Sequence, residues 1–495
     1  MLIKNRQGLG IIAIFLVFLF LRLYQLGAHD FWYDEMISIS YAKNPWHNWN
    51  APLYWIVLHF WSGAFGFSEF SLRFPSLLFN FLAVIVVYFF GKELFNKRIG
   101  LVAAILMGLS PFHLWYAQEA RDYSMVLFLS SVSAWMFYKS LKYPCLRWWL
   151  AFIVSSVLAI YTNYFYIFLL IAQVFIFLFF RKLKFNFDIK EVIAFLLIVL
   201  CFAPYLPRFW SKFIFIWKGF WLPQPNWNSL IITAENFILG YNLFPILYFI
   251  LDGAVLILLI FAYRGLRQDE IRPSLLFCSF LFFIPIIYAF IFSKLLFSVY
   301  LDRALIIFSP YFYLILATGF ASMAKNWLRF SLIGVFSVLI LIALLGFYQD
   351  WMFTPYEHHM GTFLKKPFKP ITSFIEGNLK VGDIVAVTNK NPPVVPSLKF
   401  YSRKLQNFYY FYDAGTSGAI DSNWRRPVKE SDYDIPTTKI NKIPFRRLWL
   451  LSADGGWRSG NLDDNSLAVK TWCDQNLRLK EVRIFDGLWL FKYDR

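Results

Sequence analysis

Long apolar runs recur along this chain and constrain its fold more than any other feature of the sequence. Residues 9–26 are almost entirely apolar, and similar runs return at intervals as far as residue 348. A run of about 20 apolar residues can cross the hydrocarbon core of a bilayer as a helix. Of the 495 residues 59% are hydrophobic and the mean hydropathy is +0.52, which excludes an ordinary soluble domain. The sequence therefore predicts an α-helical polytopic membrane protein.

Hydropathy predicts about eleven membrane-spanning helices. The expected spans are 9–26, 75–91, 99–116, 124–141, 148–162, 164–180, 191–207, 243–263, 274–293, 304–323 and 330–348. Lysine and arginine gather in alternate connections, within 4–6, 92–98, 139–147, 181–190, 264–272 and 325–329. By the positive-inside rule those connections are cytoplasmic. We therefore expect a multi-pass protein of the cell membrane, with its N-terminus in the cytoplasm and its C-terminal part outside.

The formal net charge of +18 does not indicate a nucleic-acid partner. The basic residues form short clusters between apolar runs and do not gather into the single stripe that nucleic-acid binding favours. We expect the lipid bilayer as a partner, no nucleic acid and no nucleotide cofactor.

Two extracytoplasmic connections, 27–74 and 205–242, are far longer than loops between membrane helices need to be. Both mix Trp, Tyr and Pro with charged residues, which suits short helices at the membrane surface. After residue 348 the apolar runs give way to β-rich stretches and one helical piece. The stretches are DIVAVTN, FYYFY, RRLWLLS and VRIFDGLWLFK, and the helical piece is KPITSFIEGNLK. We expect a membrane domain over 1–348 and an extracytoplasmic α/β domain over 349–495.

Asp34 and Glu35 follow the first predicted span, in the segment HDFWYDEMISIS. Carboxylates beside a membrane often have a function. An adjacent Asp-Glu pair is also common at a solvated helix start, where the helix dipole favours negative charge. The residues alone leave both interpretations open.

Further charged residues fall on the same predicted side of the membrane and are candidates for one site. They are Glu69, Arg73, Glu119, Arg121, Asp122, Asp302 and Arg303. Carboxylates can deprotonate an acceptor hydroxyl, and arginine binds phosphate with two parallel hydrogen bonds. An enzyme that transfers a group from an activated lipid phosphate needs both roles.

Each of these motifs also has a purely structural interpretation. Glu119 and Arg121 can pair with one another at the interface, and the run APLYW can be a proline-initiated amphipathic helix. A lone arginine such as Arg303 at the edge of a span can be a snorkelling anchor.

At these residues the chain resembles a known family, the lipid-phosphate-sugar-dependent glycosyltransferases of the C-type (GT-C) fold. It looks most like the branch of dolichyl-phosphate-mannose protein mannosyltransferases and bacterial aminoarabinose transferases. The matching segments are RLYQLGAHDFWYDE, APLYWIVLHFW, GFSEFSLRFPS, SPFHLWYAQEARDYSM and YLDRALIIFSP. The resemblance implies transfer, with inversion, of a hexose-type sugar, with mannose as the expected sugar. The implied donor is a dolichyl or undecaprenyl phosphate sugar, and the implied acceptor is an extracytoplasmic protein, lipid or glycan.

The resemblance also implies roles for individual residues. Asp34 would be the general base with Glu35 in support, and Arg121 and Arg303 would bind the donor phosphate. Further site candidates are Glu69, Arg73, Tyr54 and Tyr123. Some relatives hold a divalent cation among these carboxylates, which makes Asp34, Glu119 and Asp122 the candidate ligands, since hard cations prefer oxygen donors.

The chain departs from the family pattern in two places. Relatives commonly have His-Pro or Pro-Pro before the Leu-Tyr pair, whereas this chain has Asn50-Ala51-Pro52. The C-terminal domain resembles no accessory domain of the protein mannosyltransferases. The class of acceptor therefore stays open.

Two other functions compete with the transferase. A transporter or flippase of a lipid-linked sugar also needs many spans, but transporters place their charged sites near the bilayer midplane, not in surface loops. A non-catalytic scaffold for envelope assembly would tolerate Asp34→Asn without loss, whereas the transferase would lose turnover.

Overall fold

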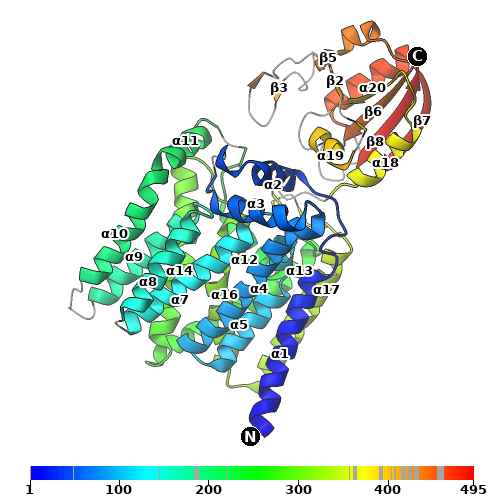
Figure 1. Ribbon diagram of the computed structural model, residues 1–495. Helices are drawn as coiled ribbons and strands as arrows, with labels where there is room; N and C mark the ends of the chain where they lie inside the picture. The colour runs from blue at the N-terminus through cyan, green and yellow to red at the C-terminus, as the bar shows by residue number, and fades with distance from the viewer. Residues whose placement is uncertain are drawn as a thin grey trace. The chain divides into compact units, whose positions relative to one another are not determined.

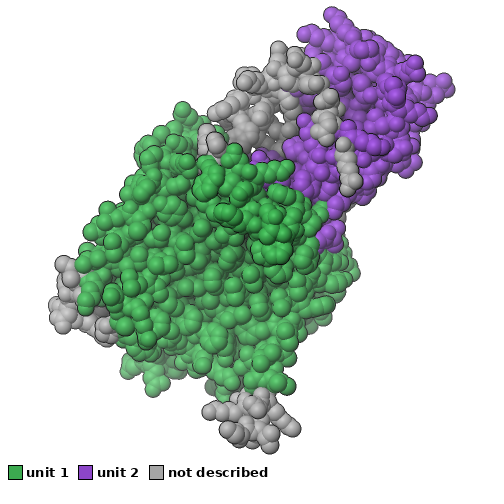
Figure 2. Space-filling model, in the orientation of Figure 1, with its two compact units in different colours: residues 1–26, 41–218, 222–361 green, residues 27–40, 219–221, 362–495 purple. Residues whose placement is uncertain are grey.

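The structure is a computed structural model in which most of the chain is described (Figure 1). The described residues are 2–47, 50–143, 145–182, 189–219, 221–355, 357–360, 365–388, 394–402, 404–405, 408–413, 420–421, 426–427, 434–453, 462–485 and 487–495. Part of the basic connection predicted at 181–190 lies outside them. The chain forms two compact units (Figure 2). Unit 1 comprises 1–26, 41–218 and 222–361, and unit 2 comprises 27–40, 219–221 and 362–495.

Helices occupy all eleven of the predicted spans. They are α1 (Leu2–Leu23), α4 (Glu69–Leu94), α5 (Lys97–Leu109) with α6 (Pro111–Ala117), α7 (Tyr123–Lys142), α8 (Leu146–Ile160), α9 (Tyr166–Lys182), α10 (Ile189–Phe202), α13 (Pro245–Arg264) followed by η3 (Gly265–Arg267), α14 (Arg272–Leu295), α16 (Ser309–Ser322) and α17 (Asn326–Tyr348). Within the described residues, six helices are long and apolar enough to cross a membrane, or seven if one bent pair counts as a single span. The multi-pass helical class is confirmed, whereas the number eleven stays a prediction.

The bent pair is α5 and α6, which break the single span predicted over 99–116. The two helices meet at an angle of 63°. Pro111 begins α6 and has no amide hydrogen to continue the hydrogen bonds of α5. The Ser110 hydroxyl accepts a hydrogen bond from the His113 amide at 3.4 Å and donates one to the Phe237 carbonyl at 2.6 Å. The break brings α6 to an end at Ala117, just before the charged segment 119–122.

The two long connections contain short helices, as predicted. The first holds α2 (Tyr33–Lys43), η1 (Pro45–His47) and α3 (Leu53–Phe65), and the second holds η2 (Ala203–Tyr205), α11 (Leu206–Trp217) and α12 (Trp227–Leu239). Pro52 is the N-cap residue of α3, which buries Tyr54, Trp55 and Leu58. The run APLYW therefore begins a proline-initiated amphipathic helix. The next helix, α4, starts at Glu69, before the predicted start at residue 75.

The core of unit 1 lies around α16. Every residue from 302 to 320 is buried, which includes α15 (Asp302–Leu305) and η4 (Ile306–Phe308). Helices α5, α13 and α14 pack against α16, and α4 packs against both α5 and α7 (Figure 1). Helices α4 and α5 approach closely, because a Cβ atom on Gly91 would lie only 2.8 Å from the Gly100 Cα.

Unit 2 contains a mixed six-stranded sheet. Its strands are β1 (Asp383–Val387), β2 (Tyr409–Tyr412), β5 (Asp434–Pro436), β6 (Arg447–Ala453), β7 (Arg478–Phe485) and β8 (Leu488–Asp494), in the order β5-β2-β1-β6-β8-β7. The first four strands in that order are parallel, and β8 runs antiparallel to β6 and β7. A separate pair is formed by β3 (Ile420–Asp421) and β4 (Arg426–Pro427).

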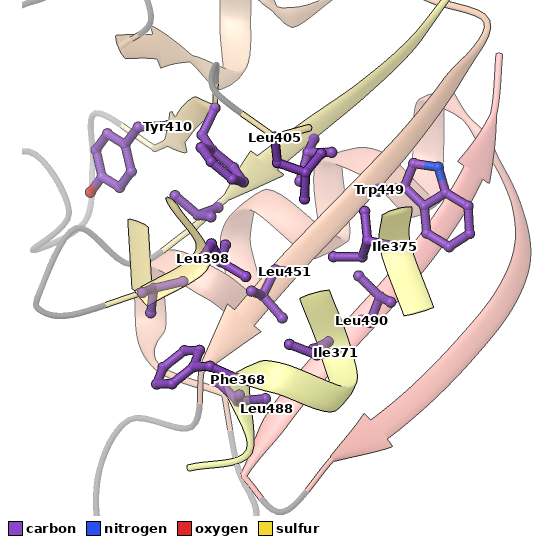
Figure 3. Packing of buried hydrophobic residues seen from close by; sticks show 14 residues of the cluster. Phe368, Ile371, Ile375, Leu398, Leu405, Tyr410, Trp449, Leu451, Leu488 and Leu490 are labelled. Carbon is purple, nitrogen blue, oxygen red and sulfur yellow. The ribbon is translucent and has the colours of Figure 1, made fainter. Parts of the chain in front are cut away.

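Helices cover both faces of this sheet. They are α18 (Phe368–Asn378), α19 (Val394–Tyr401) and α20 (Asp464–Asn476), with η6 (Thr437–Lys442). Successive side chains of a strand point to opposite faces. Trp449 and Leu451 therefore pack with Ile371 of α18 (Figure 3), while Leu448 and Leu450 pack on the other face, with residues of α20. The α/β class predicted for the C-terminal domain is confirmed.

Two boundaries differ in detail from the sequence prediction. The stretch VRIFDGLWLFK contains two strands, β7 and β8, joined through Gly487, whose φ of 77° favours glycine. The composition changes at residue 348, but Thr354 donates a hydrogen bond to the Tyr241 carbonyl at 2.9 Å, and the chain up to residue 361 packs with unit 1. The change in composition marks the end of the apolar helix α17, whereas unit 1 continues beyond that helix.

Candidate functional site

The predicted site residues belong to both units. Asp34 and Glu35 lie in unit 2, whereas the other candidates lie in unit 1. Those others are Tyr54, Glu69, Arg73, Glu119, Arg121, Asp122, Tyr123 and Arg303.

Asp34 and Glu35 lie in the first turn of α2, so the acid pair does start a helix. They differ in exposure, because Glu35 is fully buried and Asp34 is half-buried. The Glu35 carboxylate accepts a hydrogen bond from the Trp32 amide at 3.3 Å. Trp32 directly precedes the helix, so this bond is one half of a capping box. Glu35 therefore has a structural role at the start of α2, and the catalytic role of Asp34 stays a prediction.

Arg121 and Arg303 share one aromatic partner in unit 1. The Arg121 Cζ atom lies 5.6 Å from the centroid of the Tyr123 ring, and the Arg303 Cζ atom lies 6.0 Å from the same centroid. Arg121 also lies 5.3 Å from the ring of Trp55. Cation–π contacts of this kind attract a guanidinium to the face of an aromatic ring. The fold therefore brings together two arginines that are far apart in the sequence and that the family resemblance assigned to one phosphate.

Arg303 is buried, with 7% of its surface exposed. A snorkelling arginine places its guanidinium in water or at the headgroups. The contact with Tyr123 and the burial inside unit 1 argue against that interpretation and for a role within the protein.

Hydrogen bonds to its backbone fix the position of Arg121. The Ser76 hydroxyl donates to the Arg121 carbonyl at 3.0 Å, and Tyr54 and Ser76 share a hydrogen bond of 2.8 Å. Tyr54, on α3, is fully buried. Tyr54 thus supports the arginine through Ser76 of α4.

The acidic candidates near Arg121 are buried and hydrogen-bonded. The Glu119 carboxylate accepts a hydrogen bond from the Trp115 indole at 2.6 Å, and the Asp122 carboxylate accepts one from the Asn163 amide at 2.8 Å. The Arg121 Nε atom lies 4.0 Å from an Asp122 oxygen. These bonds keep both carboxylates oriented inside unit 1.

The metal site predicted at Asp34, Glu119 and Asp122 stays a prediction. Over the described ranges, no group of three His, Cys, Asp or Glu side chains is arranged to hold a metal ion. Of the predicted ligands, Glu119 and Asp122 belong to unit 1 and Asp34 to unit 2.

Arg73 connects two helices at the edge of unit 1. Its fully buried guanidinium donates a hydrogen bond to the Leu26 carbonyl, just after α1, at 3.1 Å. Glu69 begins α4, and Ser68 caps that helix by accepting from the Ser71 amide at 3.2 Å. These contacts give Arg73 a structural role, and its function in a site stays a prediction.

Sequence reasoning missed a polar cluster beside Arg303. The Asn236 side-chain amide donates to the Asp302 carboxylate and, at 2.7 Å, to the His358 carbonyl. The His358 ring lies 2.9 Å from a Glu235 oxygen. One amide group carries two donor hydrogens, so it can serve both acceptors at once. No sequence signal connects these residues, because they come from α12, α15 and the segment after α17.

Comparison with known proteins supports the resemblance. Residues 50–210 match the family model described as dolichyl-phosphate-mannose-protein mannosyltransferase. No curated protein sequence matches the chain.

Two solved proteins provide structural comparisons, and ArnT matches over nearly the whole length. ArnT from Cupriavidus metallidurans, in the apo state and bound to undecaprenyl phosphate, matches with a TM-score of 0.61 and 13% identity over 99% of this chain and 98% of ArnT. AglB from Archaeoglobus fulgidus, in complex with an inhibitory peptide and a dolichol-phosphate, matches with a TM-score of 0.45 and 11% identity over 77% of this chain and 62% of AglB. The chain shares the GT-C fold of ArnT, and the fold predicted from the resemblance is confirmed.

Proposed function

We propose that this chain is an integral-membrane glycosyltransferase that moves a hexose-type sugar from a polyprenyl-phosphate donor to an acceptor outside the cytoplasm. The observation that carries this proposal is the pair of arginines, the partly buried Arg121 and the buried Arg303, held against the single ring of Tyr123. Two guanidinium groups in a partly dry environment suit a phosphate, because arginine offers planar, bidentate hydrogen bonding to its oxygens.

The proposed reaction is one displacement at the anomeric carbon of the sugar. Asp34 takes the proton from the acceptor hydroxyl, and the acceptor oxygen forms a bond to the anomeric carbon. The bond between that carbon and the phosphate oxygen breaks, and the lipid phosphate leaves with the electron pair. Arg121 and Arg303 stabilise the negative charge that develops on the departing phosphate. A single displacement of this kind inverts the configuration at the anomeric carbon.

Three findings support the assignment. Residues 50–210, which include Arg121 and Tyr123, match the mannosyltransferase family model. The fold is shared with ArnT, which has been solved with undecaprenyl phosphate bound. The exposure of Asp34 and the burial of Glu35 favour Asp34 as the base. Mannose as the sugar, and a divalent cation among the carboxylates, stay predictions, and no step above depends on the cation.

The test is sugar transfer by the purified full-length protein in detergent. A panel of polyprenyl-phosphate sugars with radiolabelled sugar is offered together with candidate acceptors, and released lipid phosphate is measured. Turnover by the wild type and its loss in Asp34→Asn would support the proposal, since asparagine preserves shape but cannot take the proton. Turnover that persists in Asp34→Asn would remove Asp34 from the chemistry. No turnover from any donor by the wild type would contradict the transferase itself.

A further inference from the structure

The segment that precedes the acid pair has no secondary structure of its own. Residues 30–32 lie outside any helix or strand, yet Asp30, Phe31 and Trp32 are 8%, 0% and 3% exposed. Buried backbone groups need hydrogen-bond partners. The Trp32 amide binds Glu35 nearby, whereas the Phe31 amide and the Asp30 side chain find partners at the far end of the chain, in α19 and α18 of unit 2.

Asp30 caps the N-terminus of α18. Its carboxylate accepts a hydrogen bond from the Lys369 amide at 2.7 Å, in the first turn of that helix, and lies 3.8 Å from the Lys369 ammonium. The residue at the N-cap position of α18 is Pro367, whose side chain makes no capping bond. The first amides of a helix have no partner within the helix, and negative charge is favoured there. Asp30 therefore supplies the cap that the local sequence of α18 lacks.

Phe31 is held by α19. The Phe31 amide donates a hydrogen bond to the Tyr401 hydroxyl at 2.8 Å, and the Phe31 ring meets the Phe400 ring edge-on at 5.4 Å. The Lys369 ammonium lies 5.4 Å from the Tyr401 ring, so the contacts of Asp30 and Phe31 form one connected anchor.

The anchor continues directly into the acid pair. The Trp32 amide binds Glu35 at 3.3 Å, and the Ser38 hydroxyl binds the Asp34 carbonyl at 3.0 Å. Asp30 and Asp34 are only four residues apart, and the cap at Trp32 leaves little freedom between them. Whatever fixes residues 30 and 31 therefore fixes the first turn of α2.

We infer that the C-terminal α/β domain positions the catalytic acid, through Asp30 on α18 and Phe31 on Tyr401. This inference rests on the proposed function, because it assigns the domain a task in that reaction. Asp30 and Tyr401 are positioning residues that act through the backbone of 30–35. The domain can position Asp34 in this way without binding the acceptor.

The test compares Asp30→Ala and Tyr401→Phe with the wild-type full-length protein. Asp30→Ala removes both contacts of Asp30 with Lys369, and Tyr401→Phe removes the bond to the Phe31 amide. We expect kcat to fall by roughly 10- to 100-fold in each variant while KM for the donor stays unchanged. Neither variant alters Arg121 or Arg303, which the proposed function assigns to the donor phosphate. Hydrogen exchange of a peptide covering 29–36 should become faster in both variants. Asp30→Asn retains an acceptor oxygen for the Lys369 amide and should recover most of kcat.

The matched control is Asp463→Ala in the same unit. Asp463 caps α20 by accepting from the Ser466 amide at 2.6 Å, so its loss also uncaps a helix of the domain. We expect this variant to retain kcat and the slow exchange of 29–36. A general loss of domain stability would instead lower kcat in all three variants alike, and would overturn the inference.

Two further outcomes separate the inference from the proposed function. Faster exchange of 29–36 in Asp30→Ala and Tyr401→Phe with wild-type kcat would overturn the inference and leave the transferase intact. Absence of turnover in the wild type would overturn the proposed function and, with it, the catalytic meaning of the anchor.

Discussion

The proposed function assigns the binding of the lipid phosphate to single residues of unit 1. Arg303→Lys keeps the positive charge but loses the planar fork that matches phosphate oxygens. Because one charged hydrogen bond contributes about 1.5–3 kcal/mol, we expect KM for the polyprenyl-phosphate donor to rise by about tenfold or more. Steady-state kinetics measures this change, with the exposed Arg267→Lys as control. An unchanged KM would remove Arg303 from the phosphate site.

A second prediction at the residue scale concerns Asp383 of β1. Burial alone would raise the pKa of Asp383, but hydrogen bonds from Arg447, at 2.6 and 2.8 Å, from the Lys380 amide and from Trp449 outweigh it and hold the pKa below its ordinary value of 3.8. A carboxyl with a lowered pKa stabilises the folded state above its ordinary pKa, and loses that contribution as the pH falls below it.

The measurement is hydrogen exchange of β1 and β6 peptides as a function of pH. After correction for the intrinsic exchange rate, we expect the protection of these amides to be high at neutral pH and to decline as the pH falls below 3.8. Asp383→Asn should lower the opening free energy by about 1–3 kcal/mol at pH 7, because Arg447 loses its charged partner. The variant should also lose the pH dependence. Equal protection in variant and wild type at pH 7 would contradict this account.

At the scale of elements, close contact between α4 and α5 depends on two glycines. A Cβ on Gly100 would meet the backbone nitrogen of Lys92 at 2.6 Å, whereas Gly253 in α13 has open space around it. Backbone atoms cannot move aside as a flexible side chain can, so overpacking there costs about 1–3 kcal/mol. We expect Gly100→Ala to lower the thermal midpoint in detergent. Gly253→Ala should leave the midpoint unchanged or raise it, since alanine favours a helix.

The break between α5 and α6 also depends on contacts between elements. Pro111 and the Ser110 hydroxyl are visible in the sequence, but a proline inside an apolar run does not by itself tell whether a helix will bend or stop. In the folded protein the Ser110 hydroxyl donates a hydrogen bond to the Phe237 carbonyl of α12, and this bond stabilises the break between α5 and α6. The position of the break is therefore a property of packing.

At the scale of the whole molecule, the charge pattern predicts the orientation in the membrane. The N-terminus is expected in the cytoplasm and the α/β domain outside, because lysine and arginine gather in alternate connections. A reporter enzyme that is active only outside the cytoplasm, fused after Arg495, should be active, and the same reporter fused before Met1 should be inactive. The reverse pattern would contradict the topology and move Asp34 to the cytoplasmic side.

The sequence by itself determined the class of this protein. The lengths of the apolar runs indicated where the helices lie, because a helix that crosses a bilayer needs about 20 apolar residues. The composition of short β-rich stretches indicated β1, β2 and β6, because β-branched and aromatic residues favour strands. Motif order also identified Arg121, Tyr123 and Arg303 as candidates before any geometry was known.

Only the tertiary structure decided which of these residues meet. Arg121 and Arg303 share a ring because η4 packs against α7 and α14. Asp30 caps α18 although 339 positions separate it from Lys369. Local sequence carries no record of such contacts, since each depends on the simultaneous placement of several elements. The burial of Glu35 also depends on packing, whereas its bond to Trp32 is local to the start of α2, and its role in the site stays a prediction.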